Sequence, residues 1–129
     1  MPIAFWSVFA AFCLVYLAKV PVGIAQNALG RYDNRNPREQ QARLEGWGKR
    51  AHAAHLNSFE GFAAFAAAVA LNHLAGGDAA LAGKLGVAYV ISRVIYIGLY
   101  IADVHLVRSV VWAAGMGCIV GLFVSPALN

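Results

Sequence analysis

Asn57 and Glu60 are polar side chains in an apolar setting, and their types could hold a charged or hydrogen-bonding ligand. They belong to the segment RAHAAHLNSFEGFAAFAAAVALNHL (residues 50–74), whose basic, polar beginning gives way to an alanine-rich apolar end. At about 100° per residue in a helix, both side chains share a stripe with Arg50. A later segment repeats this pattern, because one helical stripe there carries Tyr89, Arg93, Tyr96 and Tyr100.

These two stripes are expected to meet at the same depth in a pair of antiparallel helices. Arg50 and Asp103 are expected to mark the same end of the two helices. Glu60 lies ten residues from Arg50, and Arg93 lies ten residues from Asp103. Each separation is about 15 Å at 1.5 Å per residue. We therefore expect Glu60 and Arg93 to be ion-pair partners, since an isolated charge deep in a bilayer costs at least ~2.5–3.5 kcal/mol.

The polar cluster, which comprises Asn57, Glu60, Arg93, Tyr96 and Tyr100, allows two interpretations. It could be a salt bridge with a hydrogen-bonding network that fixes how the helices align. It could instead line a polar cleft, open to the cytoplasm, that accepts a hydrophilic ligand. The second interpretation is favoured because one carboxylate needs one arginine as its partner, without an asparagine and several tyrosines besides.

Arg108 and Ser109 stand at the predicted start of another helix and are candidate catalytic residues. A cation at a helix N-terminus can stabilise a thiolate or another anion. The alternative is an arginine that extends from the membrane interface into water. His52 and His55 could supply half of a metal site, but no further ligand follows at a suitable spacing, so we predict no metal.

Membrane-spanning helices are the elements that must position these residues. Of the 129 residues, 60% are hydrophobic and 12% are charged, whereas soluble domains carry about 25% charged residues. A membrane helix needs about 20 mostly apolar residues. Four segments meet this requirement, at roughly 3–27, 53–75, 80–102 and 107–125. The sequence therefore predicts an all-α fold, with one integral membrane four-helix bundle over residues 1–129.

Two local features interrupt this pattern. Pro21 and Gly23 predict a kink in the first helix. Asn36 followed by Pro37 predicts a helix start, and residues 38–45 are expected to form a short surface helix.

Basic residues gather in the predicted loop of residues 28–50. This loop holds six arginines and lysines against three acidic residues, whereas the opposite side has only Asp78 and Lys84. The positive-inside rule places this loop and the short 103–108 loop in the cytoplasm, with both termini on the other side. The net charge of +4 suits anionic headgroups or an anionic ligand. We predict no nucleic-acid partner, because basic and aromatic residues are not interleaved.

Small residues are expected to bring the helices together. Alanines are frequent in residues 63–68, and Gly117 and Gly121 have the GxxxG spacing that allows close approach in lipid. Four short helices enclose little volume, so we expect any site to lie between helices or between subunits.

Two motifs resemble those of the membrane-associated proteins in eicosanoid and glutathione metabolism, the MAPEG family. RAHAAHLNSFE resembles the family's second-helix signature, an arginine followed by AHxNxxE. SRVIYIGLYIADVHLVRS resembles the family's segment from helix three to helix four. Chain length, four hydrophobic segments and the basic first loop agree, so the resemblance spans nearly the whole chain.

The resemblance implies a four-helix membrane protein that forms a homotrimer and binds glutathione between subunits, near the cytoplasmic side. Asn57, Glu60, Arg93, Tyr96 and Tyr100 match positions that line this site. Arg108 matches the arginine proposed to activate the glutathione thiol, and Ser109 matches the serine beside it in some members. We expect a bacterial-type member in the cell inner membrane.

One departure from the family concerns Ala53, which stands where well-studied members have an arginine that grips a glutathione carboxylate. Arg50, one turn nearer the cytoplasm, is the candidate to replace it. The departure allows two alternatives, another thiol as substrate or a relative without transferase activity.

The sequence thus predicts a membrane-bound, glutathione-dependent transferase or peroxidase that acts on lipophilic electrophiles. Arg108 would stabilise the thiolate, and the hydrophobic acceptor would arrive from the bilayer. The alternative is a non-catalytic membrane protein that binds lipid or a partner, with the polar cluster serving helix and subunit assembly. A transporter or channel subunit is a third hypothesis, ranked lowest because the single cluster provides no second gate.

Overall fold

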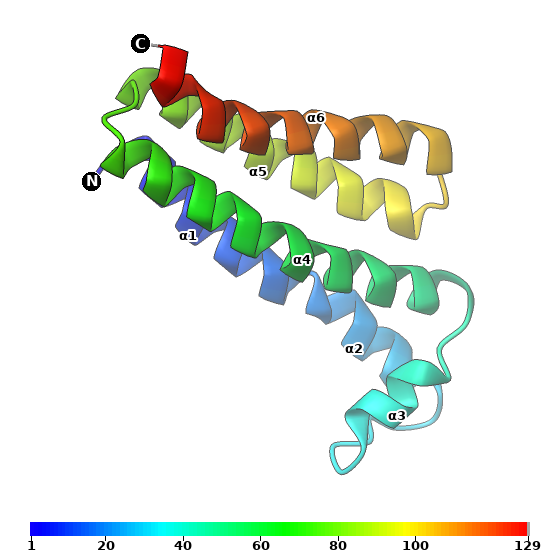
Figure 1. The fold of residues 1–129 in the computed structure, drawn as a ribbon. Helices are drawn as coiled ribbons and strands as arrows, with labels where there is room; N and C mark the ends of the chain where they lie inside the picture. The colour runs from blue at the N-terminus through cyan, green and yellow to red at the C-terminus, as the bar shows by residue number, and fades with distance from the viewer. Residues whose placement is uncertain (129) are drawn as a thin grey trace.

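The computed structural model describes residues 1–128, which are all-helical (Figure 1). In this part of the chain the long helical segments are α1 (Ile3–Leu17) continued by α2 (Lys19–Ala28), α4 (Gly46–Leu74), α5 (Ala79–Ile101) and α6 (His105–Val124). The short helix α3 (Pro37–Ala42) lies between α2 and α4, and a 3-10 turn (Ser125–Leu128) follows α6. The predicted all-α class and its four long segments are confirmed.

The first long segment breaks between Leu17 and Lys19, close to the predicted kink. Pro21 has no amide hydrogen to donate to the carbonyl of Leu17, four residues earlier, and its ring crowds that carbonyl. The amide of Ala18 still donates to the carbonyl of Leu14 at 2.9 Å and closes the last turn of α1. The kink therefore lies one turn before the proline.

The connection between α2 and α4 is fastened by Gln40, which is 3% exposed. Its Nε2 donates to the carbonyls of Arg31 at 2.7 Å and Gln26 at 3.2 Å, and its Oε1 accepts from the amide of Asp33 at 3.0 Å. The surface helix predicted at 38–45 is present but runs from Pro37 to Ala42. The hydrogen bonds of the Gln40 side chain connect this loop to the end of α2.

Helix α4 begins at Gly46, seven residues before the predicted start at residue 53. Gly46 has a φ of 57°, a left-handed conformation that glycine adopts at little cost, and it turns the chain into α4. The first turns then pack on α2, since a Cβ added to Gly48 would lie 2.7 Å from the Cβ of Ala25. The boundary prediction followed the last charged residues, which mark the edge of the apolar run rather than the helix start.

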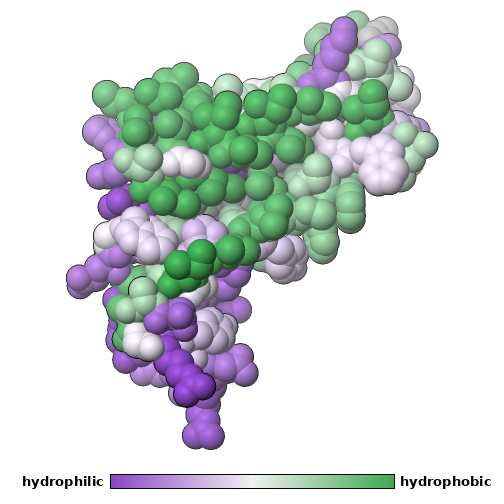
Figure 2. Space-filling view, turned by 180° about the vertical axis from the view of Figure 1, so that it is seen from behind, coloured by the Kyte–Doolittle hydropathy of each residue, from purple (hydrophilic) through white to green (hydrophobic). Residues whose placement is uncertain are grey.

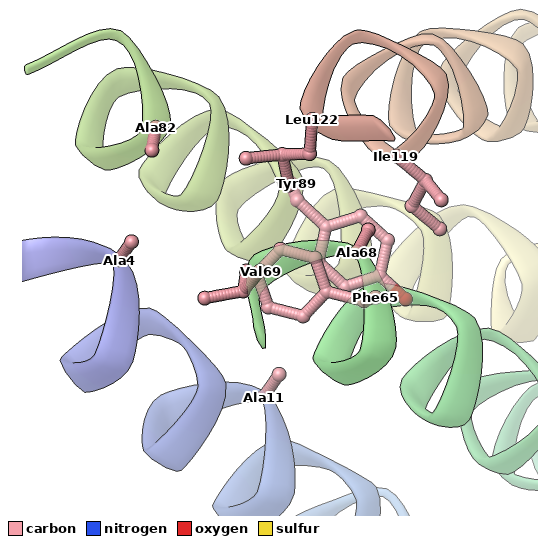
Figure 3. Close-up of a cluster of buried hydrophobic side chains, with 9 residues drawn as sticks. All are labelled: Ala4, Ala11, Phe65, Ala68, Val69, Ala82, Tyr89, Ile119 and Leu122. Atoms are coloured by element: carbon pink, nitrogen blue, oxygen red, sulfur yellow. The ribbon is translucent and has the colours of Figure 1, made fainter. Parts of the chain in front are cut away.

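The hydrophobic core lies where α1, α4, α5 and α6 meet (Figure 3). At its centre the rings of Phe65 and Tyr89 stack with their centroids 4.0 Å apart. Phe65 and Leu122 have no exposed surface. Alanines supply much of the remaining core, so the helix backbones come close around one aromatic pair.

Glycines set the closest approaches of the helices, and these positions only partly match the predicted pair, Gly117 and Gly121. A Cβ added to Gly86 would lie 2.9 Å from the Ser7 hydroxyl, and one added to Gly115 would lie 2.7 Å from the Ser92 hydroxyl. Of the predicted pair, a Cβ added to Gly121 would lie 3.3 Å from a methyl group of Leu85 on α5, whereas one added to Gly117 would meet no neighbouring helix within 4 Å. The GxxxG spacing therefore identified one close contact, at Gly121, but not the tightest contacts within one chain.

Three segments are long and apolar enough to cross a membrane, namely Ile3–Ala28, Ala79–Ile101 and His105–Leu128. Helix α4 is not among them, although a span was predicted at 53–75, because Asn57 and Glu60 lower its hydropathy. Its 29 residues extend about 43 Å, enough for a bilayer by length. Hydrophobic residues cover much of the surface, and hydrophilic ones gather around α3 (Figure 2).

The two ends of the bundle are each tied by a polar side chain. Arg50 Nε donates to the carbonyl of Ile101 at 3.0 Å, so the basic loop and the α5–α6 turn share one end, as predicted. At the other end, Asn72 Nδ2 donates to the Leu122 carbonyl at 2.7 Å and to the Ser125 hydroxyl at 2.8 Å. Both termini lie at this second end (Figure 1).

Replacing Asn72 should loosen that end. We expect Asn72→Ala to lower the free energy of unfolding in detergent by about 1–3 kcal/mol, because the substitution leaves a buried carbonyl without its donor. Ser125→Ala is the matched control, since it removes one of the two bonds and spares the bond to Leu122. Thermal unfolding followed by circular dichroism makes the comparison. An Asn72→Ala protein no less stable than Ser125→Ala would contradict this role.

Candidate functional site

Arg93 is a buried arginine of α5, with 6% of its surface exposed. Its Nη2 donates to the hydroxyl of Ser58 on α4 at 3.2 Å, and this hydroxyl donates to the carbonyl of Ala54 at 2.8 Å. The hydrogen-bonding partner of Arg93 is therefore Ser58 rather than the predicted Glu60. Glu60 accepts a bond from Asn57 Nδ2 at 3.3 Å.

The alignment of α4 with α5 explains this correction. Arg50 lies eight residues before Ser58, and Ile101 lies eight residues after Arg93. The Arg50–Ile101 and Ser58–Arg93 bonds therefore define one antiparallel register. The prediction paired Glu60 with Arg93 and was displaced by two residues, or about 3 Å along the helix. Ser58 was missed, although it lies near the stripe that contains Arg50.

A cavity of about 170 Å³ lies between α4, α5 and α6. Asn57, Glu60 and Arg93 line it, together with Tyr89, Ser92 and Trp112. Two glycines allow side chains of α5 to form the cavity wall. A Cβ added to Gly61 would lie 2.7 Å from the Tyr89 hydroxyl, and one added to Gly115 would lie 2.7 Å from the Ser92 hydroxyl. The structure thus gathers the polar residues of α4 and α5 around one space, even though Glu60 and Arg93 are not hydrogen-bonded.

Two residues that line this cavity each have a polar atom buried without a partner in the described residues, Arg93 Nε and Asn57 Oδ1. Buried polar atoms in proteins are nearly always hydrogen-bonded. One of these atoms is a donor and the other an acceptor. The cavity therefore has unused capacity for a ligand that carries both an acceptor and a donor.

A column of contacting side chains leads from the cavity toward the basic end of the bundle. The Arg93 guanidinium lies 4.1 Å from the centroid of the Tyr96 ring. Tyr96 meets Tyr100 edge to face at 5.6 Å, and the Arg108 guanidinium lies 4.1 Å from the Tyr100 ring. This column, made of Arg93, Tyr96, Tyr100 and Arg108, is about 10 Å long from residue 93 to residue 100 of α5. It presents a cation at each end.

The turn between α5 and α6 brings Arg108 onto this column. Asp103 has a φ of 63°, and the amides of Asp103 and Val104 donate to the carbonyls of Tyr100 and Leu99. This pattern ends a helix with one residue in the left-handed conformation. It reverses the chain so tightly that the first turn of α6 lies beside Tyr100, and the half-buried Arg108 reaches the ring.

The other two predicted site residues, Ser109 and Arg50, have contacts of a structural kind. The exposed Ser109 hydroxyl donates to the carbonyl of His105 in its own helix at 3.1 Å. No described contact joins Ser109 to the column. Arg50 caps the end of α5 through Ile101, where the last carbonyls of the helix need donors. Its Nε is therefore committed to helix packing.

Two histidines of α4, His52 and His55, lie on another side of the helix, as the helical spacing predicts. His55 Nδ1 is 2.9 Å from the carbonyl of Val15, and both His52 and His55 line a separate cavity beside α2 and α3. Among residues 1–128, no three histidine, cysteine or carboxylate side chains come together as metal ligands.

A sequence model of the MAPEG family matches residues 3–128. The chain belongs to the MAPEG family. No curated protein and no solved structure matched. The MAPEG fold is a membrane four-helix bundle, typically trimeric, and its members are generally glutathione-dependent transferases or peroxidases, or eicosanoid enzymes. This MAPEG protein is therefore an integral membrane protein. Helix α4, the second long segment in chain order, completes its four-helix bundle.

The hydrogen bond between Ser58 and Arg93 can be tested by a double-mutant cycle. We expect Ser58→Ala and Arg93→Gln each to lower the midpoint of thermal unfolding in detergent, and the double mutant to lose less than their sum. Ser7→Ala is the control, because the Ser7 hydroxyl bonds to Ile3 within its own helix. Its effect should add to that of Arg93→Gln. Additive losses for Ser58 and Arg93 would show that they are not partners.

Proposed function

We propose that this MAPEG protein is a glutathione-dependent transferase or peroxidase that acts on lipophilic electrophiles. The observation that carries the proposal is the column of Arg93, Tyr96, Tyr100 and Arg108, which begins at a cavity with an unpartnered donor and acceptor. If the cluster served assembly alone, the unpartnered donor and acceptor would be expected to have partners within the protein. A ligand site leaves them free to bind the ligand.

The dimensions and charges of the site fit a short anionic peptide. An extended tripeptide spans about 10 Å, close to the length of the column. Glutathione carries two carboxylates, an ammonium group and a thiol. The carboxylates suit Arg93 and the phenols of Tyr96 and Tyr100, and the ammonium suits Glu60, which accepts hydrogen bonds only. Asn57 has both a donor and an acceptor to offer the peptide bonds.

Arg108 is proposed to hold the glutathione sulfur as a thiolate. Its guanidinium lies on the Tyr100 ring at the start of α6, where the helix dipole also favours an anion. The thiolate attacks an electrophilic carbon and forms a C–S bond, and the displaced electron pair leaves with the leaving group or takes a proton from water. In the peroxidase reaction, two thiols and a peroxide give a disulfide, an alcohol and water.

The lipophilic substrate is proposed to enter past Trp112. This residue lines the cavity from α6 and is 42% exposed on the hydrophobic surface. A molecule dissolved in the bilayer could thus reach the cavity without crossing the basic, water-facing end, where glutathione would enter.

A homotrimer in a bacterial inner membrane belongs to the same proposal, with both termini on the non-cytoplasmic side. The cavity of about 170 Å³ is smaller than typical ligand pockets of about 300–1,000 Å³. A second subunit would supply the missing wall for a tripeptide.

The alternative function, a non-catalytic protein that uses the cluster for assembly, is supported by a specific observation. The hydrogen bonds that Arg50 and Arg93 make both join α4 to α5. Arg50 and Arg93 therefore have a packing role whether or not a ligand binds, whereas Arg108 makes no hydrogen bond between α4 and α5.

Native mass spectrometry of the detergent-purified protein tests the oligomeric state. We expect the dominant mass to be that of three 13.7 kDa chains. A dominant monomer or dimer would remove the intersubunit wall and with it the glutathione site in this form.

Arg108→Ala is the substitution that separates enzyme from assembly protein. We expect at least a ~10-fold loss of thiol conjugation to a model electrophile, which corresponds to about 1.4 kcal/mol of anion stabilisation, with trimer assembly retained. Arg35→Ala, in the exposed loop, is the matched control and should keep full activity. Equal activity in the Arg108→Ala protein and the wild type would leave no role for Arg108 as the thiolate-stabilising group.

Ala53→Arg tests the grip on the substrate. If the missing arginine weakens binding, its introduction should lower the Kd for glutathione, because a charge-assisted contact with a carboxylate is gained. Ala53→Gln is the control for size and should give a smaller gain. If neither the wild type nor Ala53→Arg binds glutathione or another cellular thiol, the assembly function replaces the enzymatic one.

A further inference from the structure

A second cavity, of about 550 Å³, lies between α2, α3 and α4 on the opposite side of α4 from the column. We call it the basic cavity. The residues of its wall that matter here are Lys19, Arg38, His52, His55, Leu56 and Phe59. None of the described residues that line it is acidic. The glutathione proposal makes no use of this space.

The two charged side chains of the basic cavity, Lys19 and Arg38, are both cations that line the same space. Lys19 is within electrostatic reach of Arg38. Like charges held together in a partly buried site repel each other, and an anion between them removes that repulsion. His52 Nδ1 is in addition buried without a partner in the described residues. The cavity therefore matches an anion with several acceptor oxygens, such as a phosphate.

The apolar part of the wall indicates that the phosphate belongs to a lipid. Leu56 and Phe59 are 48% and 47% exposed at the cavity. Phe59 contacts Tyr16 at 6.0 Å between centroids, and Tyr16 begins an aromatic row along α1. The row continues through Phe12, Phe9 and Trp6, each ring 5.1–6.4 Å from the next. All four side chains of the row are at least 44% exposed.

We propose that the basic cavity binds the phosphate of an anionic phospholipid, whose acyl chain lies along the aromatic row of α1. The position fits this occupant, because the cavity lies at the basic end of the bundle and the row runs from it along an apolar membrane-spanning segment. A free phosphate would use the cations but leave the row without a role.

Binding to purified protein in a neutral detergent tests the proposal. The probes are phosphatidylglycerol, phosphatidylcholine with the same acyl chains, and inorganic phosphate, each titrated by native mass spectrometry and thermal shift. We expect phosphatidylglycerol to bind at least ~10-fold more tightly than phosphatidylcholine, a difference of about 1.4 kcal/mol. Inorganic phosphate at the same concentration should give no comparable stabilisation. Equal stabilisation by inorganic phosphate would identify a soluble-anion site and overturn the lipid proposal.

Paired variants locate the binding. Lys19→Gln/Arg38→Gln removes two charges from the cavity and should reduce phosphatidylglycerol binding to the phosphatidylcholine level. Arg31→Gln/Lys49→Gln removes two exposed charges at the same end but outside the cavity, and should change binding less than ~2-fold. Equal losses would mean unspecific attraction. If the first pair does not fold, Arg38→Gln alone, at an exposed position of α3, must still weaken binding more than Arg31→Gln, or the proposal fails.

Discussion

The attachment of α4 to α5 by two arginines is the constraint on which the rest of the site depends. Arg93 bonds to Ser58 in the middle of the pair, and Arg50 bonds to Ile101 at its end. Both bonds cross between helices, and the buried Arg93 lies where an unpaired charge is costly. They fix one register, and this register decides which residues face the cavity. A shift of a few ångströms would separate Asn57 and Glu60 from Arg93.

Small residues make this arrangement possible. Gly61 admits the Tyr89 hydroxyl and Gly115 admits the Ser92 hydroxyl, so polar groups of α5 fit against both neighbouring helices. Asp103, in the left-handed conformation, reverses the chain in a tight turn between α5 and α6. This turn brings the Arg108 guanidinium onto the Tyr100 ring. The column of Arg93, Tyr96, Tyr100 and Arg108 therefore depends on how α4, α5 and α6 pack together. The basic cavity at Lys19 and Arg38 lies on the opposite side of α4 from this column, and it does not depend on the column.

The sequence predicted the helices, the kink at Pro21 and the grouping of Asn57, Glu60 and Arg93, because hydrophobic runs and a period of 3.6 residues report burial and face directly. It could not predict the register of α4 with α5. That register comes from hydrogen bonds to Ser58 and the Ile101 carbonyl, and neither acceptor differs in pattern from its neighbours. The start of α4 at Gly46 and the tight contacts at Gly86 and Gly115 depend likewise on partners distant in sequence.

The most direct test of the central claim is to count the protons released when glutathione binds near neutral pH. Calorimetric titration in buffers of different ionisation enthalpy measures that number. If Arg108 and the start of α6 hold a thiolate, binding should release close to one proton per occupied site, since a free thiol with a pKa near ~8.5–9 is mostly protonated at this pH. S-methylglutathione, which has no thiol proton, should bind without this release. Binding of glutathione with no more proton release than its S-methyl analogue would contradict the account.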